Sequence, residues 1–462
     1  MNKSNTEKEP AKKPSMSFGQ ILNMSIGFLG IQMGFALQTG NASRILQTFG
    51  ADVDKLTWFW LAAPLTGMII QPIIVHYSDN TWTRLGRRRP YFLTGALLSA
   101  LALFFMPHAP WLKALIAPVI VGAGTLMIMD ASFNVAMEPF RALIADDLPE
   151  EQHNQGFSVQ TALIGVGAII GSLLPYVLPA WFGVAKTAPK GTVPPNVLYS
   201  FMAGAVVLVA TVLWTVFTTK EYSPEEQASF QADKQEESKD DQEDKNQSAI
   251  AEVFSNLVHM PTTMKQLAVV QFFTWYALFS MWVFTTPALA EHVFHIKAGD
   301  TSSEGYNNAA NWVDILFGVY NAVSAIYALL LPKILTKISR KKIHSFSLIM
   351  GGLGLISLFL IKNQYLLIVP MVGIGLAWGS ALAIPYAILS NSIPPQKIGV
   401  YMGIFNFTIT IPQILNGIVG GLLVKHIFNN QPIYALVMAG VFLFIAALSV
   451  RWLQDDPEKQ SA

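Results

Sequence analysis

Residues 130–146, Asp-Ala-Ser-Phe-Asn-Val-Ala-Met-Glu-Pro-Phe-Arg-Ala-Leu-Ile-Ala-Asp, place an acid deep in an apolar run and a Pro-x-Arg-Ala-Leu turn at the end of that run. A carboxylate near the centre of a bilayer costs about 3 kcal/mol on insertion scales. Asp130 is therefore expected to be used by the protein or to be well partnered inside it. We favour use, and the alternative is a structural acid that stays hydrogen-bonded within a helix bundle.

The rest of the chain has the composition of a polytopic membrane protein. Of its 462 residues, 52% are hydrophobic and 13% are charged, and its mean hydropathy of +0.42 is well above that of soluble chains. Apolar stretches of the roughly 20 residues that a bilayer requires recur along nearly the whole length. The predicted spans are residues 18–38, 58–77, 91–107, 112–138, 155–183, 197–217, 263–290, 311–337, 343–361, 365–391, 399–425 and 431–453.

Several classes of function are disfavoured by what the sequence lacks. A net charge of +1 favours neither nucleic acid nor acidic partners, and the absence of cysteine excludes disulfides and thiolate metal sites. The chain has no Gly-x-x-x-x-Gly-Lys-Ser/Thr motif for phosphate binding, so ATP-driven transport is not expected. No nucleophile-base pair or metal-ligand cluster is evident, so we expect no enzymatic activity, no metal and no cofactor.

A polar segment divides the predicted spans into two sets. Residues 220–262 form the linker, and its part up to residue 247 is rich in acids, which is typical of a solvated segment. The predicted units are therefore an N-terminal tail (1–17), a six-helix half (18–219), the linker, a second six-helix half (263–453) and a C-terminal tail (454–462).

Basic loops indicate the orientation in the membrane. Lys and Arg are concentrated after the second span and again after the eighth, whereas the opposite loops mix both signs of charge. By the positive-inside rule, both termini and the linker are predicted to be cytoplasmic, in a multi-pass protein of the cell (inner or plasma) membrane.

The two halves resemble each other internally. Pro139-Phe-Arg-Ala-Leu corresponds to Pro385-Tyr-Ala-Ile-Leu, and Gly167-x-x-x-Gly171 corresponds to Gly417-x-x-x-Gly421. Gly-x-x-x-Gly is common in membrane helices, so it supports the repeat only weakly. The predicted fold class is all-α, with twelve transmembrane helices in two six-helix pseudo-repeats. Such repeats place a substrate site at their interface near the midplane, as in secondary transporters.

The fourth span carries a polar stripe. At about 100° per residue, Asp130, Asn134 and Arg141 lie within about 40° of one another, and Glu138 lies about 80° from Asp130. Glu138 and Arg141 are three residues apart and could instead form a simple interfacial ion pair. Asp130 lies about two turns deeper, where an acid can load and release protons during a transport cycle.

Other polar side chains are candidates for contact with a substrate. Amides both donate and accept hydrogen bonds, which suits sugar hydroxyls, although interhelical hydrogen bonds are an equal alternative for each residue. In the first span the candidates are Gln32, Gln38, Asn41 and Arg44, and in the second half they are Asn321, Asn406, Gln413 and Asn416.

Tryptophans divide by their place in the spans. Trp275 and Trp378 lie within spans and could stack on the apolar face of a sugar, with plain packing as the alternative. Trp58, Trp60 and Trp111 lie near span ends, where interfacial anchoring is the ordinary role.

Charges near the cytoplasmic ends are candidates for a gating network. Asp79 with Arg84, Arg87 and Arg88 could latch helices together and release them as the halves rock, and the same charges also set topology. Glu138 and Arg141 complete this predicted network.

Five motifs of the first half carry a family resemblance: Gln32-Met-Gly-Phe-Ala-Leu-Gln38, Gly67-Met68 with Gln71-Pro72, Tyr77-Ser-Asp79, Arg84-Leu-Gly-Arg-Arg-Arg-Pro90 and Asp130 to Asp146. Together these motifs resemble the major facilitator superfamily, and within it the plant sucrose:proton symporters and the bacterial glycoside transporters. The resemblance implies that Asp130 couples protons and contacts the sugar, and that the substrate is a disaccharide or another glycoside.

The second half departs from the plant pattern. Thr274-Trp275 resembles the seventh helix of that family, but Thr285 stands where the plant proteins have an acid and Tyr320 where they have an arginine. Arg44 replaces a proline of the plant pattern. Sucrose, maltose and other alpha-glucosides therefore remain open as substrates.

The predicted function is proton-coupled import of such a sugar by alternating access, in a monomer that needs only the sugar, the proton and the bilayer. Arg44 or Arg141 is expected to approach Asp130 in some state of the cycle and to favour its deprotonation. Sodium coupling and facilitated diffusion are alternatives within transport. A transporter-like sugar sensor, with the linker as its output, is the alternative from another class.

Overall fold

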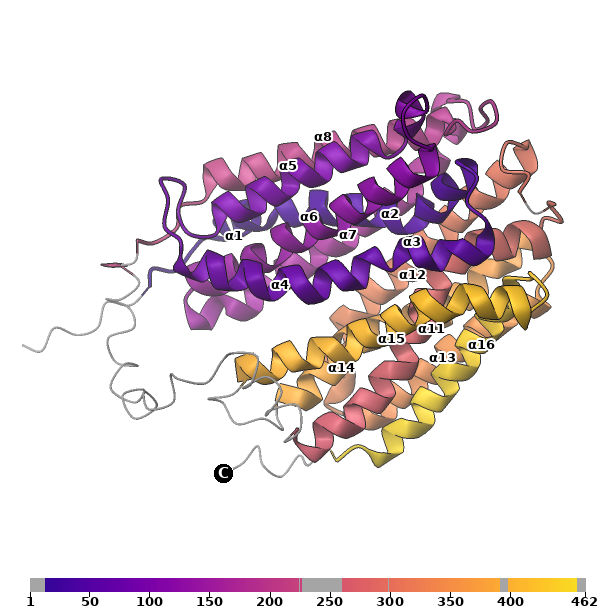
Figure 1. Cartoon of the computed structure of the whole chain (residues 1–462). Coiled ribbons are helices and arrows are strands. Elements are labelled where there is room, and N and C mark those ends of the chain that lie inside the picture. The colour runs from indigo at the N-terminus through magenta and orange to yellow at the C-terminus, as the bar shows by residue number, and fades with distance from the viewer. Residues whose placement is uncertain (1–12, 224, 227–259, 298, 391–397, 455–462) are drawn as a thin grey trace, which may run out of the picture.

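The computed structural model describes residues 13–223, 225–226, 260–297, 299–390 and 398–454, and within helices a few further side chains are left undescribed. In this part of the chain the secondary structure consists of α-helices, most of them long, and short 3-10 turns, without a β-strand. We call α1 to α8 the first half and α11 to α16 the second half. Figure 1 shows them as two bundles, the first coloured indigo to magenta and the second salmon to yellow.

Eight helices form the first half. They are α1 (Phe18–Ser25), α2 (Gly27–Thr48), α3 (Leu56–Trp60), α4 (Ala62–Asn80), α5 (Arg89–Phe105), α6 (Pro118–Asp147), α7 (Glu150–Phe182) and α8 (Pro195–Thr218). Six helices form the second half: α11 (Thr262–His292), α12 (Glu304–Leu335), α13 (Arg340–Leu360), α14 (Ile368–Ser390), α15 (Ile398–His426) and α16 (Ile433–Ser449).

These helices account for the predicted spans. Among the described residues, ten helical segments are long and apolar enough to cross a membrane, and one of them joins α1 and α2. Arg89–Phe105 is a shorter apolar helix. The remaining predicted span is divided at Leu61 into α3 and α4.

The fourth predicted span has the wrong boundaries. Pro118 stands in the first turn of α6, where its missing N–H is not needed, and the helix then continues past Pro139 to Asp147. The predicted turn at Pro139 is therefore part of a helix, and Pro385 likewise lies inside α14. Membrane helices tolerate proline in this way because neighbouring helices and side chains satisfy the freed backbone group.

Apolar packing holds each half together. In the first half α2 packs against α7 and α8, and α5 packs against α6 and α8. Phe140 stacks between Phe28 and Phe92, with ring centroids 4.1 and 4.6 Å apart. In the second half α13 packs against α14 and α16, and α11 packs against α16. Across the halves α7 contacts α12, and α15 contacts α3 and α4.

The two Gly-x-x-x-Gly motifs have different partners. A Cβ on Gly167 or Gly171 would overlap backbone atoms of α2, so this motif lets α7 and α2 approach within the first half. A Cβ on Gly421 would overlap the backbone carbonyl of Asp54, and Gly417 faces Leu61. The second motif therefore brings α15 against the first half, across the boundary between the bundles.

The bundles meet most closely at one end. We call the side on which α1 begins and α16 ends the terminal side, and the opposite side the distal side. On the distal side Ser43 donates to the Val283 carbonyl at 2.9 Å, and the Gly421 N–H donates to Thr57 Oγ1 at 3.2 Å. Lys425 pairs with Asp54 at 3.2 Å. In Figure 1 the two bundles converge toward these helix ends.

Candidate functional site

A cavity of about 740 Å³ lies between the halves, within the size range of small-molecule sites. Both halves contribute to it: α2, α3, α4, α6 and α7 from the first, and α11, α12, α14 and α15 from the second. Its lining extends along α6 from Asp130 to Arg141, toward the terminal side. We call it the central cavity.

The predicted acid lines this cavity. Asp130 is 4% exposed, and its Oδ1 accepts a hydrogen bond from Gln38 Nε2 on α2. Asn134, one turn further along α6, donates to the Asp130 backbone carbonyl at 2.9 Å. Asp130 Oδ2 has no hydrogen-bond partner among the described residues. This oxygen is buried, and its hydrogen-bonding capacity is unused in this conformation.

The two arginines that were predicted to approach Asp130 lie in different parts of the structure. Arg141 lines the central cavity. Arg44 is 1% exposed, and its guanidinium donates to Asn307 and Asn311 at 2.8 Å each. Neither Arg44 nor Asn41 is among the described residues of the cavity lining. The approach of either arginine to Asp130 stays a prediction for other states of the protein.

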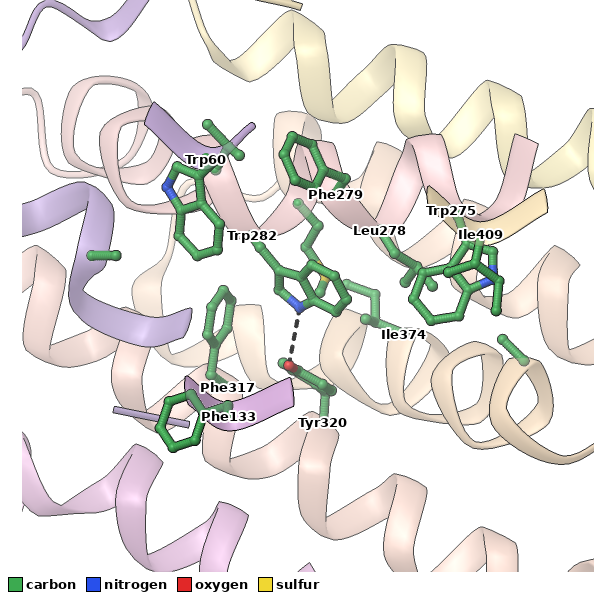
Figure 2. Close-up of a cluster of buried hydrophobic side chains, with 14 of the residues drawn as sticks. Trp60, Phe133, Trp275, Leu278, Phe279, Trp282, Phe317, Tyr320, Ile374 and Ile409 are labelled. Atoms are coloured by element: carbon green, nitrogen blue, oxygen red, sulfur yellow. Dashed lines mark hydrogen bonds between the residues drawn. The ribbon is translucent and has the colours of Figure 1, made fainter. Parts of the chain in front are cut away.

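Aromatic side chains form the wall contributed by the second half. Trp275 and Trp378, both singled out from the sequence, lie edge to face with ring centroids 5.7 Å apart. Trp282 stands 5.4 Å from Trp378 and donates from Nε1 to Tyr320 Oη at 3.3 Å. Figure 2 shows Trp282 and Tyr320 joined by this bond, with Trp275 on the same helix. The seven-residue spacing from Trp275 to Trp282 was a helical signal that the sequence prediction missed.

The amides of the second half divide between two environments. Asn321, Asn406 and Gln413 line the central cavity with the tryptophans. Asn416 is buried and donates to the Tyr276 carbonyl at 2.9 Å. Gln32 and Gln38 of the first half also line the cavity.

Trp60 was predicted to be an interfacial anchor, and this is wrong. Its side chain is buried, donates from Nε1 to Ser43 Oγ at 3.0 Å and lines the central cavity. Leu61, between α3 and α4, has right-handed helical backbone angles (φ −60°, ψ −25°), so the helical repeat continues there, and Trp60 lies on the face turned toward the interior. Trp58 and Trp111, at 50% and 64% exposed, have the outward placement that anchoring requires.

A buried polar cluster joins α2 to α12 on the distal side of the central cavity. Asp314 accepts from Asn41 Nδ2 at 3.0 Å and lies 3.9 Å from Arg44 Nη1. Asn196 of α8 donates to Asn311 Oδ1 at 2.9 Å. We call Asn41, Arg44, Asn196, Asn307, Asn311 and Asp314 the distal clasp. Asp314 was not predicted, because it lies only three residues inside the expected start of its span.

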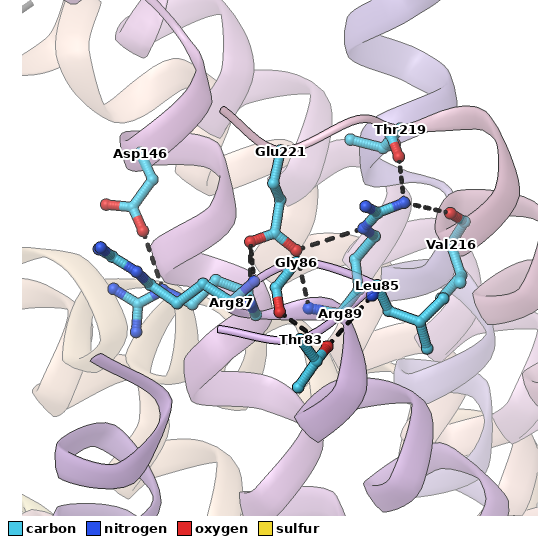
Figure 3. A network of polar contacts seen from close by, with 10 residues as sticks. Thr83, Leu85, Gly86, Arg87, Arg89, Asp146, Val216, Thr219 and Glu221 are labelled. Atoms are coloured by element: carbon cyan, nitrogen blue, oxygen red, sulfur yellow. Dashed lines mark hydrogen bonds and ion pairs between the residues drawn. The ribbon is translucent and has the colours of Figure 1, made fainter. Parts of the chain in front are cut away.

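A second polar cluster lies on the terminal side (Figure 3). The Glu221 carboxylate accepts from the backbone N–H groups of Arg87, Arg88 and Arg89, at 2.7 to 2.9 Å. These N–H groups lie at the start of α5, where a helix favours negative charge. Arg88 Nε also pairs with Asp146 at 2.9 Å. These contacts connect α5 to α6 and to the segment after α8.

The predicted gating residues are only partly in this cluster. Arg87 and Arg88 belong to it, whereas Arg84 is exposed. The side chains of Asp79 and Glu138 lie outside the described residues. Glu221, Arg89 and Asp146 take part without having been predicted, and the gating role itself stays a prediction.

Asp147 is a buried acid next to this cluster. The candidate membrane span of α6 ends at Ile144, so Asp147 lies beyond it. Burial raises the pKa of Asp147 to about 8, with further contributions from the nearby negative charges of Glu221 and Asp146. The backbone of Tyr222 and the charge of Lys13 act in the opposite direction.

Comparison with known proteins agrees with this architecture. The general alpha-glucoside permease of Schizosaccharomyces pombe is 22% identical, over 98% of this chain and 97% of that protein. The sucrose transport protein SUC4 of Arabidopsis thaliana is 24% identical, over 85% of this chain and 81% of that protein. These relatives agree with the resemblance inferred from the motifs.

Solved structures share the fold. The nucleoside transporter NupG superposes with a TM-score of 0.68 over 94% of this chain and 99% of NupG, at 14% identity. The xylose transporter XylE of E. coli, in a partially occluded inward open conformation, gives a TM-score of 0.64 over 93% of this chain and 97% of XylE, at 13% identity. The predicted all-α fold class is thereby confirmed.

The sequence pattern of the Major Facilitator Superfamily matches residues 24–417 and also residues 310–462. The first match alone covers most of the chain, including helices of both halves and every described residue that lines the central cavity. The chain therefore belongs to the Major Facilitator Superfamily, a family of membrane transporters.

Proposed function

We propose that this transporter imports a glycoside of the sucrose or maltose class together with a proton, by alternating access. The observation that carries the proposal is Asp130: a buried acid in the central cavity, with one carboxylate oxygen held by Gln38 and the other unpartnered among the described residues. The wall opposite α6 carries tryptophans and amides, which suit the apolar faces and the hydroxyls of a sugar.

The relatives support this class of substrate. Proteins similar along most of the chain are named for alpha-glucoside and sucrose transport. The cavity volume of about 740 Å³ accommodates a disaccharide. Thr285 and Tyr320, which depart from the plant pattern, leave the choice between sucrose and maltose to experiment.

The distribution of Lys and Arg among the loops supports an orientation of the protein in the membrane. The basic loops after α4 and α12 lie on the terminal side, with Arg87 and Arg88 in the first and Arg340 and Lys341 in the second. By the positive-inside rule we assign the terminal side, and with it both termini, to the cytoplasm. The distal side then faces outward, and the contacts that join the halves there describe an outward-closed conformation.

Proton entry would supply the driving force. In our scheme an external proton on Asp130 and a bound sugar together permit the halves to rock, and loss of the proton on the cytoplasmic side releases the sugar. One charge moving inward yields about 2.3 kcal/mol per 100 mV, enough for about fifty-fold accumulation.

The test is uptake by Asp130→Asn in proteoliposomes with an imposed pH gradient. We expect uphill accumulation of sucrose or maltose to be lost while exchange at equal concentrations continues, because the asparagine still hydrogen-bonds but carries no proton through the cycle. Asp52→Asn, at an exposed acid on the distal side, is the matched control. Undiminished uphill uptake by Asp130→Asn would overturn the proposal.

A second experiment distinguishes proton-coupled transport from sodium-coupled transport and facilitated diffusion. A sudden pH gradient is expected to drive sugar uptake in the native protein, whereas a sudden sodium gradient at constant pH is expected to drive none. Uptake that responds only to sodium, or to neither gradient, would replace proton coupling with sodium coupling or facilitated diffusion.

A further inference from the structure

A second cavity, of about 800 Å³, lies on the distal side. We call it the outer cavity. Its walls come from both halves: the end of α7 and the segment up to Thr187 from the first, and the start of α12 with the turn Gln364–Leu367 from the second. No described residue lines both this cavity and the central one.

The outer cavity has aromatic faces beside amides. Trp312 and Tyr365 stand edge to face with ring centroids 5.4 Å apart, and Trp312 Nε1 donates to the Gln364 carbonyl at 2.8 Å, which fixes the indole ring. Tyr176 lines the cavity from the first half, and Asn308 from the second. Flat apolar faces next to groups that donate and accept hydrogen bonds suit a polyhydroxylated ring.

The charges of the cavity cancel. Lys186 Nζ pairs with Glu304 Oε1 at 2.8 Å, and this contact connects the two halves at the cavity wall. Because the cation and the anion are matched to each other, neither sign of charge is left in excess for an ionic ligand. A neutral ligand fits this balance best.

The floor of the cavity belongs to the distal clasp. Asn311 lines the cavity, is 4% exposed, and accepts at Oδ1 from both Arg44 and Asn196. Asn308 and Trp312 flank it on α12. A ligand in the outer cavity would therefore adjoin the hydrogen bonds that hold α2, α8 and α12 together.

We propose that the outer cavity binds a neutral glycoside from outside and that the bound glycoside keeps the distal side closed. The cavity has walls from both halves, so opening of the distal side separates those walls and removes the site. A ligand that binds one conformation better shifts the population toward it, in this case toward the closed state. External sugar at high concentration thus inhibits its own uptake. The identification of the ligand as a transported glycoside rests on the proposed function.

The first measurement is the initial rate of uptake over a wide range of external sucrose and, separately, maltose. We expect the rate to rise and then to fall in the native protein. In the double variant Asn308→Ala/Tyr365→Ala the fall should be lost while uptake at low sugar stays unchanged, because both side chains lie outside the central cavity and are exposed. Tyr199→Ala, at an exposed tyrosine at the start of α8, is the matched control.

A native rate that saturates without falling overturns the proposal, and so does a fall of equal size in the double variant. Absence of uptake at every concentration would instead count against the proposed function, and a binding measurement then decides about the outer cavity. Because the chain has no cysteine, Thr187→Cys gives a single thiol in its wall.

Sucrose or maltose is expected to slow the modification of Thr187→Cys by a thiol reagent that does not cross the membrane. The same sugar should leave Lys190→Cys unaffected, since Lys190 is exposed and outside the cavity lining. Protection should persist with Asp130→Asn in the same chain. Protection that is missing, or that disappears with Asp130→Asn, would overturn the outer site.

Discussion

Asp130 and Asp314 are two buried acids on different halves, and one helix contacts both. Gln38, Asn41 and Arg44 follow each other at three-residue intervals along α2. Gln38 donates to Asp130, whereas Asn41 donates to Asp314 and Arg44 lies within ion-pair distance of it. A change at the carboxylate of Asp130 can therefore reach the distal clasp through the rotation or shift of a single helix.

Asp147 should make stability depend on pH. Its pKa is raised from 3.8 to about 8 in the fold, so between these values the folded state holds a proton that the unfolded state has released. The free energy of unfolding therefore falls as the pH rises from about 4 to about 8. We expect the melting temperature of the purified protein in detergent to fall over this range, and Asp147→Asn to flatten the fall.

Asp52→Asn is the control for this measurement, because Asp52 is an exposed acid. It should reproduce the native dependence of the melting temperature on pH. An equally steep fall in Asp147→Asn would show that other groups cause it, and that Asp147 is not held neutral by its surroundings.

Helix α15 meets the first half through a glycine that allows no side chain. At Gly421 a Cβ would overlap the Asp54 carbonyl, and Asp54 also pairs with Lys425 one turn further along α15. The corresponding Gly171 packs α7 on α2 inside one half. Repeated motifs thus serve internal packing in one bundle and the closing contact between bundles in the other.

Gly421→Ala is expected to weaken distal closure, because the turn Val53–Lys55 must move away to make room for the new methyl group. The measurement is the labelling of Ala383→Cys, in the lining of the central cavity, by an impermeant thiol reagent applied from the distal side. We expect faster labelling than with Ala383→Cys alone.

Gly124→Ala is the matched control, because a Cβ at this helical glycine meets no atom within 4 Å. When Gly124→Ala is combined with Ala383→Cys, the labelling rate should equal that of Ala383→Cys alone. If Gly421→Ala labels no faster than Gly124→Ala, the close approach of α15 to the first half does not limit distal opening.

The two bundles together form a closed distal side, and the distal clasp is its buried part. Arg44 and Asp314 are 1% and 0% exposed and come from opposite halves. Removing one partner of such a pair leaves an uncompensated buried charge and typically costs about 3–5 kcal/mol, whereas replacing both by apolar residues costs much less. The effects of replacing Arg44 and Asp314 on stability should therefore not be additive.

We expect Arg44→Met and Asp314→Leu each to lower the melting temperature and to speed distal labelling of Ala383→Cys. The double variant should be more stable than the two single effects predict. Lys55→Ala is the control, since Lys55 and Asp52 form an ion pair that is 60% and 63% exposed and should contribute little. Additive losses of melting temperature would contradict a coupled pair.

The membrane-spanning helices and the polar face of the fourth span could be predicted from the sequence, because both depend on local periodicity. Helices of about 20 apolar residues follow from the bilayer thickness, and the shared face of Asp130 and Asn134 follows from the helical repeat. Trp275 and Trp378 were singled out because each lies within a predicted span rather than near its end. Span ends were less accurate, as at Pro139, because a packed bundle supports a helix through a residue that would end it in water.

The amino-acid order alone thus sets the membrane class, the two sets of helices, the family and the acid of the central cavity, since each is written in contiguous composition or in the helical period. The contacts of Arg44 with Asp314, of Glu221 with the start of α5, and of α7 with α12 around the outer cavity follow from tertiary packing. They join residues far apart in the chain, and no local pattern states which polar face meets which. Burial between helices then fixes these partners, because a polar group removed from water must find one.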